Sequence, residues 1–136
     1  MVDMNNTLNY EVFVSDPPRH SLGGALPNGE PKGGSPVAST LIYGREDAVL
    51  TDPAFTTDQA RALGDWVESK GRNLTQIFIT HGHGDHWFAA ELLADRFGAR
   101  IVASAGTIAQ MHANLAARPF LWDKVYTGIR PRRSPR

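Results

Sequence analysis

The sequence predicts an α/β fold with a mixed sheet. Three observations lead to this expectation. Residues 47–51 and 74–80 are short apolar runs of the kind that form strands. The segment between them, which begins near Thr56, has apolar residues at helical spacing. Strand, helix and strand in this order make a βαβ unit, and its two strands run parallel.

The N-terminal part of the chain is predicted to contain two more strands and a long loop. Residues 10–14 are β-branched or aromatic, and residues 37–43 are an apolar run followed by a turn at 44–46. That turn predicts a hairpin with the next strand. Residues 16–36 hold five of the nine prolines and are expected to be a loop. A loop of this length is either a functional flap or a mobile surface segment.

The helix of the βαβ unit has clear signals at both ends. Thr56 and Gln59 have the spacing of a capping box, in which each side chain bonds the backbone of the other residue. Gly71 is placed to end the helix in the left-handed conformation. The apolar face predicted to lie on the sheet is formed by Ala60, Leu63 and Val67.

The second strand of the unit contains Ile77-Phe78-Ile79 without a polar interruption, so we expect it to be buried on both faces. The helix after it is predicted to open at Asp85 or His86 and to close at Gly98. Two further elements are expected, a short strand and then a helix: residues 100–103 and 104–116.

Composition limits the classes of protein to consider. A chain of 136 residues suggests one domain, and its 14 basic and 14 acidic residues balance, which disfavours nucleic acid and anionic membranes as partners. There is no cysteine, so neither a disulfide nor a cysteine metal ligand is available. Residues 1–9 lack the pattern of a secretory signal, and no apolar run is long enough for a membrane span. We expect a soluble, cytoplasmic protein.

Residues 80–86, Thr-His-Gly-His-Gly-Asp-His, are the most informative stretch. Histidine and aspartate are costly to bury together unless something pairs with them, and a divalent metal is the natural partner. In an extended backbone His81 and His83 point the same way and can bind one ion together. Asp85 and His86 are adjacent and diverge, which favours a second ion nearby.

The stretch also lies where a ligand site is expected. It follows the carboxyl end of the strand 74–80, the edge at which open α/β sheets bind their ligands. Gly82 and Gly84 are expected to leave room around the ions and to permit unusual backbone angles. The pattern therefore predicts half of a two-metal site.

The motif His-x-His-x-Asp-His after an apolar strand resembles the signature of the metallo-β-lactamase fold hydrolases, with a complete match at His81, His83, Asp85 and His86. The resemblance implies that the chain forms the N-terminal half of an αββα sandwich, a mixed sheet with helices on one face. Residues 1–117 would be the partial domain, with its core at 37–117, and residues 118–136 an irregular basic tail.

The resemblance also implies roles for particular residues. The metal ligands would be His81, His83, Asp85 and His86, and Asp85 would in addition take part in proton transfer. Asp52, at the end of strand 47–51, would lie behind the ligands and accept a hydrogen bond from the metal loop or from a ligand imidazole. Initiation of a turn at Asp52-Pro53 explains that residue type equally well. Zinc is the expected cofactor, up to two ions, with iron and manganese as alternatives.

Three polar features outside the motif are expected to be incidental. His20 lies in the long loop and is more simply an exposed bystander than a substrate contact. His112, on the edge of the last predicted helix, is more simply a partly buried histidine than a missing ligand. Residues 130–136 are rich in arginine and proline, which favours a solvated end over a nucleic-acid contact.

The implied function is a metal-dependent hydrolase, in which a metal-activated water attacks an ester, thioester, lactone or lactam of a small-molecule substrate. The alternative is a truncated, non-catalytic metal-binding remnant. Family members carry further histidine and aspartate ligands in their second half, whereas this sequence has no histidine after Ala116 and only Asp123. A homo-oligomer is the arrangement in which a partner copy would supply them.

Overall fold

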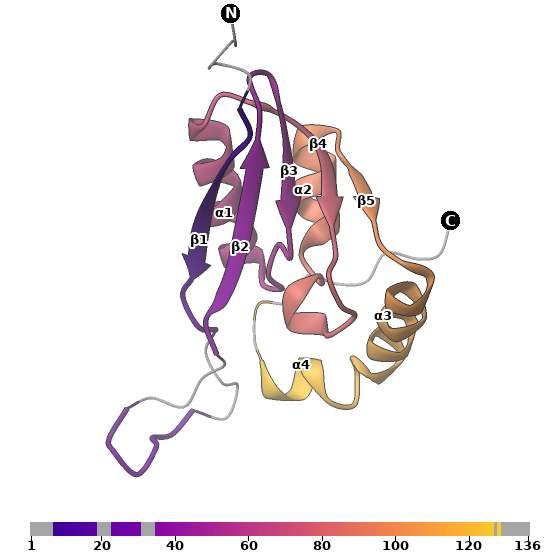
Figure 1. The fold of residues 1–136 in the computed structure, drawn as a ribbon. Coiled ribbons are helices and arrows are strands. Elements are labelled where there is room, and N and C mark those ends of the chain that lie inside the picture. The colour runs from indigo at the N-terminus through magenta and orange to yellow at the C-terminus, as the bar shows by residue number, and fades with distance from the viewer. Residues whose placement is uncertain (1–6, 19–22, 31–34, 127, 129–136) are drawn as a thin grey trace, which may run out of the picture.

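A computed structural model describes residues 7–18, 23–30, 35–126 and 128 of the chain (Figure 1). His20 and residues 130–136 lie outside the described residues. The centre of the molecule is a five-stranded sheet whose strands follow one another in chain order. The strands are β1 Asn9–Ser15, β2 Val37–Tyr43, β3 Asp47–Thr51, β4 Asn73–Phe78 and β5 Arg100–Val102.

The sheet is mixed, as the sequence predicts. β1 pairs with β2 and β2 with β3 in antiparallel fashion, and Gly44 closes the β2–β3 hairpin by donating its N–H to the carbonyl of Asp47. β3 pairs with β4, and β4 with β5, in parallel. The carboxyl ends of β3 and β4 therefore meet at one edge of the sheet, where the histidine-rich segment follows.

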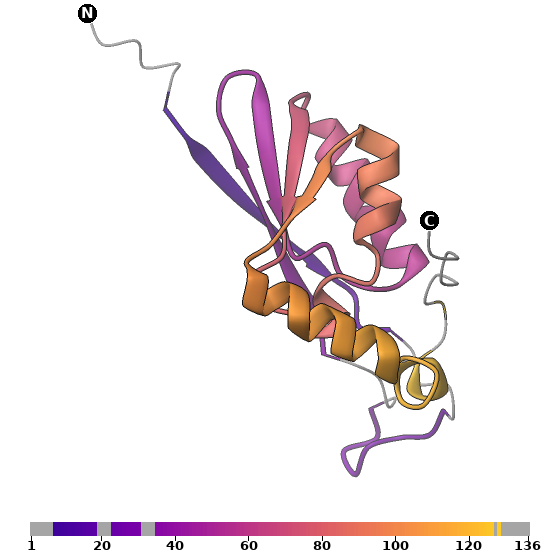
Figure 2. The ribbon, with the colours of Figure 1, turned by 90° about the vertical axis from the view of Figure 1, so that its right-hand side faces the viewer.

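The helices α1 and α2 cover the same face of the sheet, and α3 lies across the end at which β3 and β4 finish (Figure 2). This arrangement confirms the predicted α/β fold with helices on one face. Within the part of the chain that the structure describes, no helix is both long and apolar enough to cross a bilayer. The helices are α1 Thr57–Ser69, η2 Gly84–His86 (a 3-10 turn), α2 Ala90–Phe97, α3 Ala105–Ala117 and α4 Trp122–Val125.

Helix α1 begins and ends at the predicted signals. The Thr56 hydroxyl accepts the Gln59 N–H at 3.1 Å, and the Gln59 side chain accepts the Thr56 N–H at 3.1 Å, which completes the capping box. Gly71 ends the helix with φ +66°, in the region that favours glycine.

The hydrophobic core lies between the sheet and the two helices that cover it. Buried residues of β2, β3 and β4, together with Phe13 of β1, meet one side of each helix. The largest of these core side chains, all almost fully buried, are Leu41, Leu50, Leu63, Ile77, Ile79 and Leu93.

The opposite face of the sheet corrects one expectation. β4 is buried on one face only, because Phe78 is 40% exposed while Ile77 is buried. Within the described residues no helix covers this face. The apolar run at 77–79 shows that β4 is apolar on both sides, but it does not show whether anything packs on the second side. Other exposed apolar side chains from the strands are Tyr10, Val12, Val14, Ile42 and Ile101.

The segment after the histidine motif also differs from expectation. The predicted helix at Asp85 or His86 is instead the 3-10 turn η2, followed by a break at Trp87, and α2 begins only at Ala90. The Trp87 and Phe88 amides both donate to the carbonyl of Gly84, which holds the turn tight. Gly98 closes α2 in the left-handed conformation, as predicted.

The described part of the segment predicted as an irregular tail, up to residue 126, has regular structure. It contains α4, and Trp122 from this helix packs edge-on against Phe55 at 6.0 Å and Phe88 at 5.3 Å between ring centroids. Tyr126 adds a second edge-on contact to Phe55 at 5.3 Å. These aromatic contacts dock residues 122–126 beside the loop that follows β3.

Candidate metal centre

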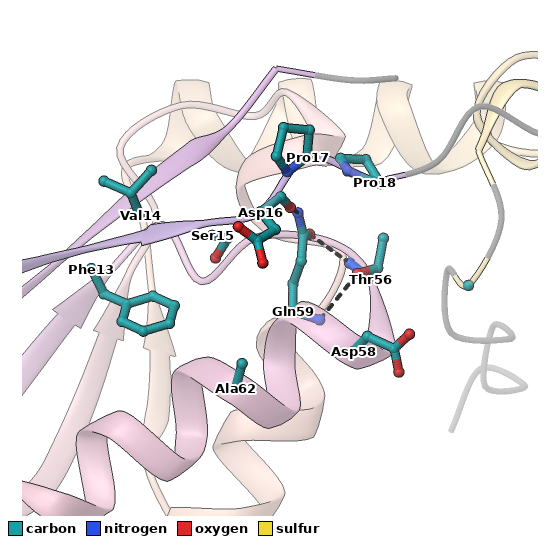
Figure 3. Close-up of a pocket in the computed structure, with 11 residues that line it drawn as sticks. Phe13, Val14, Ser15, Asp16, Pro17, Pro18, Thr56, Asp58, Gln59 and Ala62 are labelled. Carbon is teal, nitrogen blue, oxygen red and sulfur yellow. Dashed lines mark hydrogen bonds between the residues drawn. The ribbon is translucent and has the colours of Figure 1, made fainter. Parts of the chain in front are cut away.

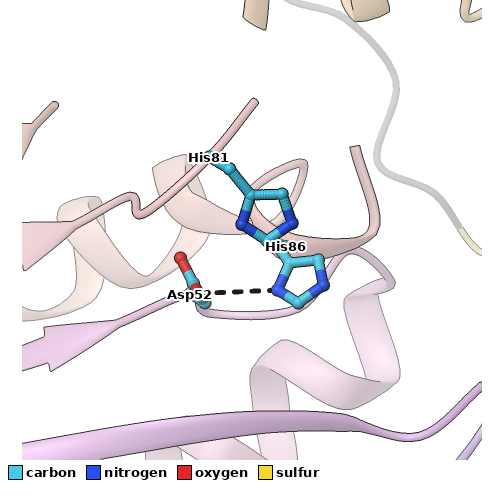
Figure 4. Close-up of side chains that lie close together, drawn as sticks. All are labelled: Asp52, His81 and His86. Atoms are coloured by element: carbon cyan, nitrogen blue, oxygen red, sulfur yellow. Dashed lines mark ion pairs between the residues drawn. The ribbon is translucent and has the colours of Figure 1, made fainter. Parts of the chain in front are cut away.

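The candidate site lies where β3 and β4 end. Asp52 follows β3 directly, and the segment from Thr80 to His86 follows β4. Figure 4 shows the side chains of Asp52, His81 and His86 converging from these two segments. The βαβ unit thus places an aspartate and a histidine cluster at the same edge of the sheet.

The backbone of Asp52 is held on several sides. Its N–H donates to the carbonyl of Phe78 at 3.1 Å, and its own carbonyl accepts the Ser39 hydroxyl at 2.7 Å and the Ala54 N–H at 2.9 Å. Its φ is +47°, a region that non-glycine residues rarely adopt. Strained conformations of this kind persist where the surroundings over-determine them, and they concentrate at functional sites.

The carboxylate of Asp52 organises the start of the histidine segment. Oδ1 accepts the Thr80 N–H at 2.9 Å, and Oδ2 accepts the Thr80 hydroxyl at 2.6 Å. That hydroxyl has one proton, which it gives to Asp52. The same hydroxyl oxygen is 2.9 Å from His81 Nδ1 and has no proton left to donate, so it accepts a hydrogen bond from the imidazole. The proton of the neutral His81 ring therefore lies on Nδ1. His81 Nε2 is left free to bind a metal, the usual consequence of such an orienting bond.

Three residues form the tightest group of potential ligands in the described part of the chain. Asp52, His81 and His86 each offer one ligand atom, and these atoms all lie within 4.8 Å of one another. The rings of His81 and His86 are 4.2 Å apart between centroids. His86 Nδ1 is 3.5 Å from Asp52 Oδ2, buried and without a hydrogen-bond partner among the described residues.

The donor set fits a divalent metal. Imidazole nitrogen and carboxylate oxygen are ligands of zinc and other first-row metals. The Asp52 carboxylate, which holds the motif through Thr80, lies 3.5 Å from His86 Nδ1 and adds negative charge beside the nitrogens that would bind a cation. A buried nitrogen without a partner costs about 1–3 kcal/mol, and a bound cation would remove that cost.

His83 and Asp85 flank this group. The His83 ring stands edge-on to His81 at 4.9 Å between centroids and is exposed. Asp85 is half-buried, with Oδ2 3.7 Å from His86 Nε2. The structure therefore brings His81 and His86 closest together with Asp52, and the division of the four motif residues between two ions stays a prediction.

Helix α3 supports the motif through two contacts that sequence reasoning missed. Gln110 Oε1 accepts the Gly82 N–H at 2.7 Å, and Asn114 Oδ1 accepts the Gly84 N–H at 3.2 Å. On the other side, Trp87 Nε1 donates to the Gly82 carbonyl at 2.9 Å. The available signal was weak: two amide side chains four residues apart share one side of a predicted helix.

The two motif glycines are required by close packing. A Cβ on Gly82 would lie 2.5 Å from Gln110 Cβ and 2.7 Å from Met111 N, and one on Gly84 would lie 2.3 Å from the Phe88 ring. Neither glycine has a positive φ, which corrects the expectation of unusual backbone angles. His112, on the same helix α3, is exposed and outside the ligand group.

The sequence of this chain matches one protein family and several of its relatives. The profile of the metallo-beta-lactamase superfamily matches residues 33–132. A metal-dependent hydrolase of Agrobacterium fabrum is 37% identical over 70 residues, which are 52% of this chain and 30% of that protein. A hydroxyacylglutathione hydrolase of Acidiphilium cryptum is 41% identical over 64 residues, 47% of this chain and 25% of that protein. The chain thus matches less than a third of the length of these relatives.

Solved structures show the same fold. The metallo-beta-lactamase FIM-1 from Pseudomonas aeruginosa, in a mono-zinc form, aligns with a TM-score of 0.56 at 15% identity over 82% of this chain and 47% of that one. The B3 metallo-beta-lactamase BLEG-1 aligns with a TM-score of 0.51 at 19% identity over 89% of this chain and 54% of that one. At this level of identity the likeness concerns the fold alone.

Proposed function

Because this chain belongs to the metallo-beta-lactamase superfamily, we propose that it is a metal-dependent hydrolase whose metal, zinc in the first instance, is held by the histidine motif. The observation that carries the proposal is the group of Asp52, His81 and His86, whose ligand atoms lie within 4.8 Å of one another. The names of two relatives, both hydrolases, support the same reaction class.

Each motif residue has a proposed role. His81, His83, Asp85 and His86 hold the metal, and Asp52 keeps the motif in place through Thr80. A divalent ion in this position supplies a water of lowered pKa and a positive charge that polarises the substrate carbonyl. Asp85, whose Oδ2 is 3.7 Å from His86 Nε2, would accept a proton from the attacking water in this proposal.

The substrate is proposed to be a small ester, thioester, lactone or lactam. One relative is named for hydroxyacylglutathione, and an acylglutathione is a thioester, so a thioester is the first substrate to try. His83 is the exposed member of the motif, and such a molecule would approach from its side.

The test begins with metal content per chain, measured by elemental mass spectrometry after gel filtration with light scattering. Hydrolysis of a thioester, ester, lactone and lactam panel with added Zn²⁺, Mn²⁺ or Fe²⁺ follows on the same sample. We expect His81→Ala and His86→Ala to lose both metal and hydrolysis. His112→Ala, which removes an exposed histidine outside the group, is the matched control and should retain both.

The second candidate function is metal binding without catalysis. It is favoured by the small number of free ligands in the described group. Asp52 already accepts two hydrogen bonds from Thr80, which leaves His81 and His86, fewer than the three or four protein ligands of a stable zinc site. Metal bound by a monomer that hydrolyses no member of the panel would establish it. Metal and activity that appear only in a dimer would mean that a second copy completes the site, and metal absent from folded protein would refute both candidates.

A further inference from the structure

A pocket of about 330 Å³ lies between the end of β1 and the first turns of α1 (Figure 3). No residue of the histidine motif lines it, so it is separate from the candidate metal centre. Its walls include the apolar side chains of Phe13, Pro17 and Ala62. Its volume is at the lower end of the range for small-molecule sites and leaves room for roughly ten non-hydrogen atoms.

One polar group in the pocket has no partner. Ser15 is only 2% exposed, and its Oγ makes no hydrogen bond with any residue that the structure describes. The neighbouring carbonyl of Asp16 is satisfied, because Gln59 Nε2 donates to it at 2.8 Å and ties β1 to α1. A buried hydroxyl left unpaired costs about 1–3 kcal/mol, so the orphaned oxygen points to a ligand that would bond it.

The charges around the pocket are negative. Asp16 and Asp58 are among its lining residues, and none of the described residues that line it is lysine or arginine. Arg61 approaches Asp58 only to 3.8 Å, and both side chains are largely exposed. Two carboxylates and an unpaired hydroxyl oxygen form an acceptor set for a cation.

An anion is disfavoured at this pocket. Two of the first three N–H groups of α1 already have acceptors: Gln59 N–H bonds Thr56 Oγ1, and Thr57 N–H bonds the carbonyl of Gly128 at 2.9 Å. The N-terminus of α1 therefore offers little of the donor set that holds phosphate or carboxylate. The two aspartates would repel such a ligand as well.

We propose that this pocket binds a small organic cation with an apolar body. The ammonium or guanidinium group lies beside the carboxylate of Asp16 and donates a hydrogen bond to Ser15 Oγ, and the exposed carboxylate of Asp58 adds negative charge at the rim. The apolar body packs against Phe13 and Ala62. Charge-assisted hydrogen bonds of this kind are the stronger ones, and here they meet a hydroxyl that is already dehydrated.

The test is a titration of the full-length, metal-free chain with 2-phenylethylammonium, followed by two-dimensional ¹⁵N–¹H NMR. Its neutral isostere 2-phenylethanol is the matched probe. We expect saturable shifts at Ser15, Asp16 and Gln59, at least about tenfold weaker binding of the alcohol, and a similar loss in Asp16→Asn and in Ser15→Ala. Asp47→Asn, which removes an exposed carboxylate at the hairpin, should leave the affinity unchanged.

Either of two results would overturn the proposal. One is the absence of saturable shifts at the pocket, and the other is equal binding of the ammonium and the alcohol. Because the chain is metal-free throughout, loss of the proposed hydrolase activity has no bearing on the outcome.

The same cation chemistry is present in the chain itself, at Arg130, Arg132, Arg133 and Arg136. A full-length variant with these four residues changed to glutamine separates the two sources. Tighter binding of the probe in this variant would mean that the chain's own guanidinium groups compete for the pocket. Unchanged affinity would mean that the pocket takes free cations alone.

Discussion

Gln110 Oε1 accepts the backbone N–H of Gly82 at 2.7 Å, and this bond joins helix α3 to the centre of the histidine motif. Asn114, one turn further along the helix, does the same for Gly84 at 3.2 Å. Both glycines are buried, so their amides depend on these acceptors. The helix therefore fixes the path of the backbone that carries His81 and His83.

Removing the Gln110 acceptor should weaken metal binding. In Gln110→Ala the Gly82 amide loses its partner, and the loop carrying the ligands gains freedom. We expect metal affinity to fall by roughly 10–100-fold, as for other groups that orient ligands, and stability to fall by about 1 kcal/mol. Competition titration against a chromophoric chelator measures the first, and urea unfolding the second.

Two controls make that experiment specific. Gln110→Glu keeps an oxygen in reach of the Gly82 amide and should restore most of the affinity. His112→Ala alters the same helix at an exposed position and should change nothing. Equal affinity in Gln110→Ala and the unaltered chain would show that the motif holds its shape without α3.

Adding a methyl group at Gly82 should destabilise the fold. The new Cβ would lie 2.7 Å from Met111 N, a backbone atom that cannot move without shifting α3. We expect Gly82→Ala to lower the free energy of unfolding by about 1–3 kcal/mol. Gly106→Ala, with nothing within 4 Å of the added Cβ, should be neutral or stabilising by up to about 1 kcal/mol. Urea midpoints of the two variants decide the point.

Local signals predicted much of the scaffold. The capping box of Thr56 and Gln59 and the closing glycines Gly71 and Gly98 are set by contacts within one helix turn, which sequence spacing shows directly. The mixed sheet follows from the order of the elements and from the length of the connections between them. Such features depend on neighbours in the chain.

Long-range packing explains what the sequence could not predict. The exposure of Phe78 depends on whether anything packs on the far side of β4. An apolar run without polar positions does not mark which face of the strand meets solvent, so the sequence could not predict this exposure. Similarly, the contacts of Gln110 and Asn114 join residues 28 and 30 positions apart. The proximity of Asp52 to His86 depends on β3 and β4 being neighbours in the sheet.

Asp52→Asn tests the support that this carboxylate gives to the motif. The amide nitrogen cannot accept the Thr80 hydroxyl, and the negative charge beside His86 Nδ1 is lost. We expect metal affinity to fall at least about tenfold, with a loss of stability of about 1–2 kcal/mol. Asp47→Asn, at the exposed start of β3, is the matched control. Isothermal titration with Zn²⁺ measures both variants, and equal affinities would remove Asp52 from the site.

The Glu11 carboxylate should make stability depend on pH. Its pKa is held below the usual 4.5, first by a hydrogen bond from Lys70 and then by one from Tyr43. A lowered pKa contributes stability above the unfolded value, and that contribution is lost as pH falls through the folded value. The urea midpoint of Glu11→Gln should therefore lie below that of the unaltered chain at pH 7, and the gap should close as the pH falls below 4.5 and through the lowered pKa of Glu11. Glu46→Gln controls for the loss of an exposed charge, and a pH-independent gap would contradict the assignment.

Trp122→Ala tests whether α4 is part of the folded domain. The indole contacts Phe55, which is part of the loop after β3, and Phe88, which is part of the turn after the histidine motif. Truncating a large aromatic side chain in such a cluster costs about 2–4 kcal/mol, the lower part applying here because Trp122 is half-buried. Phe120→Ala removes a ring that is 76% exposed and should change stability by less than about 0.5 kcal/mol. Equal thermal midpoints for the two variants would mean that residues 122–126 contribute nothing to the stability of the fold. A lower thermal midpoint for Trp122→Ala alone would mean that residues 122–126 support the loop that carries Asp52.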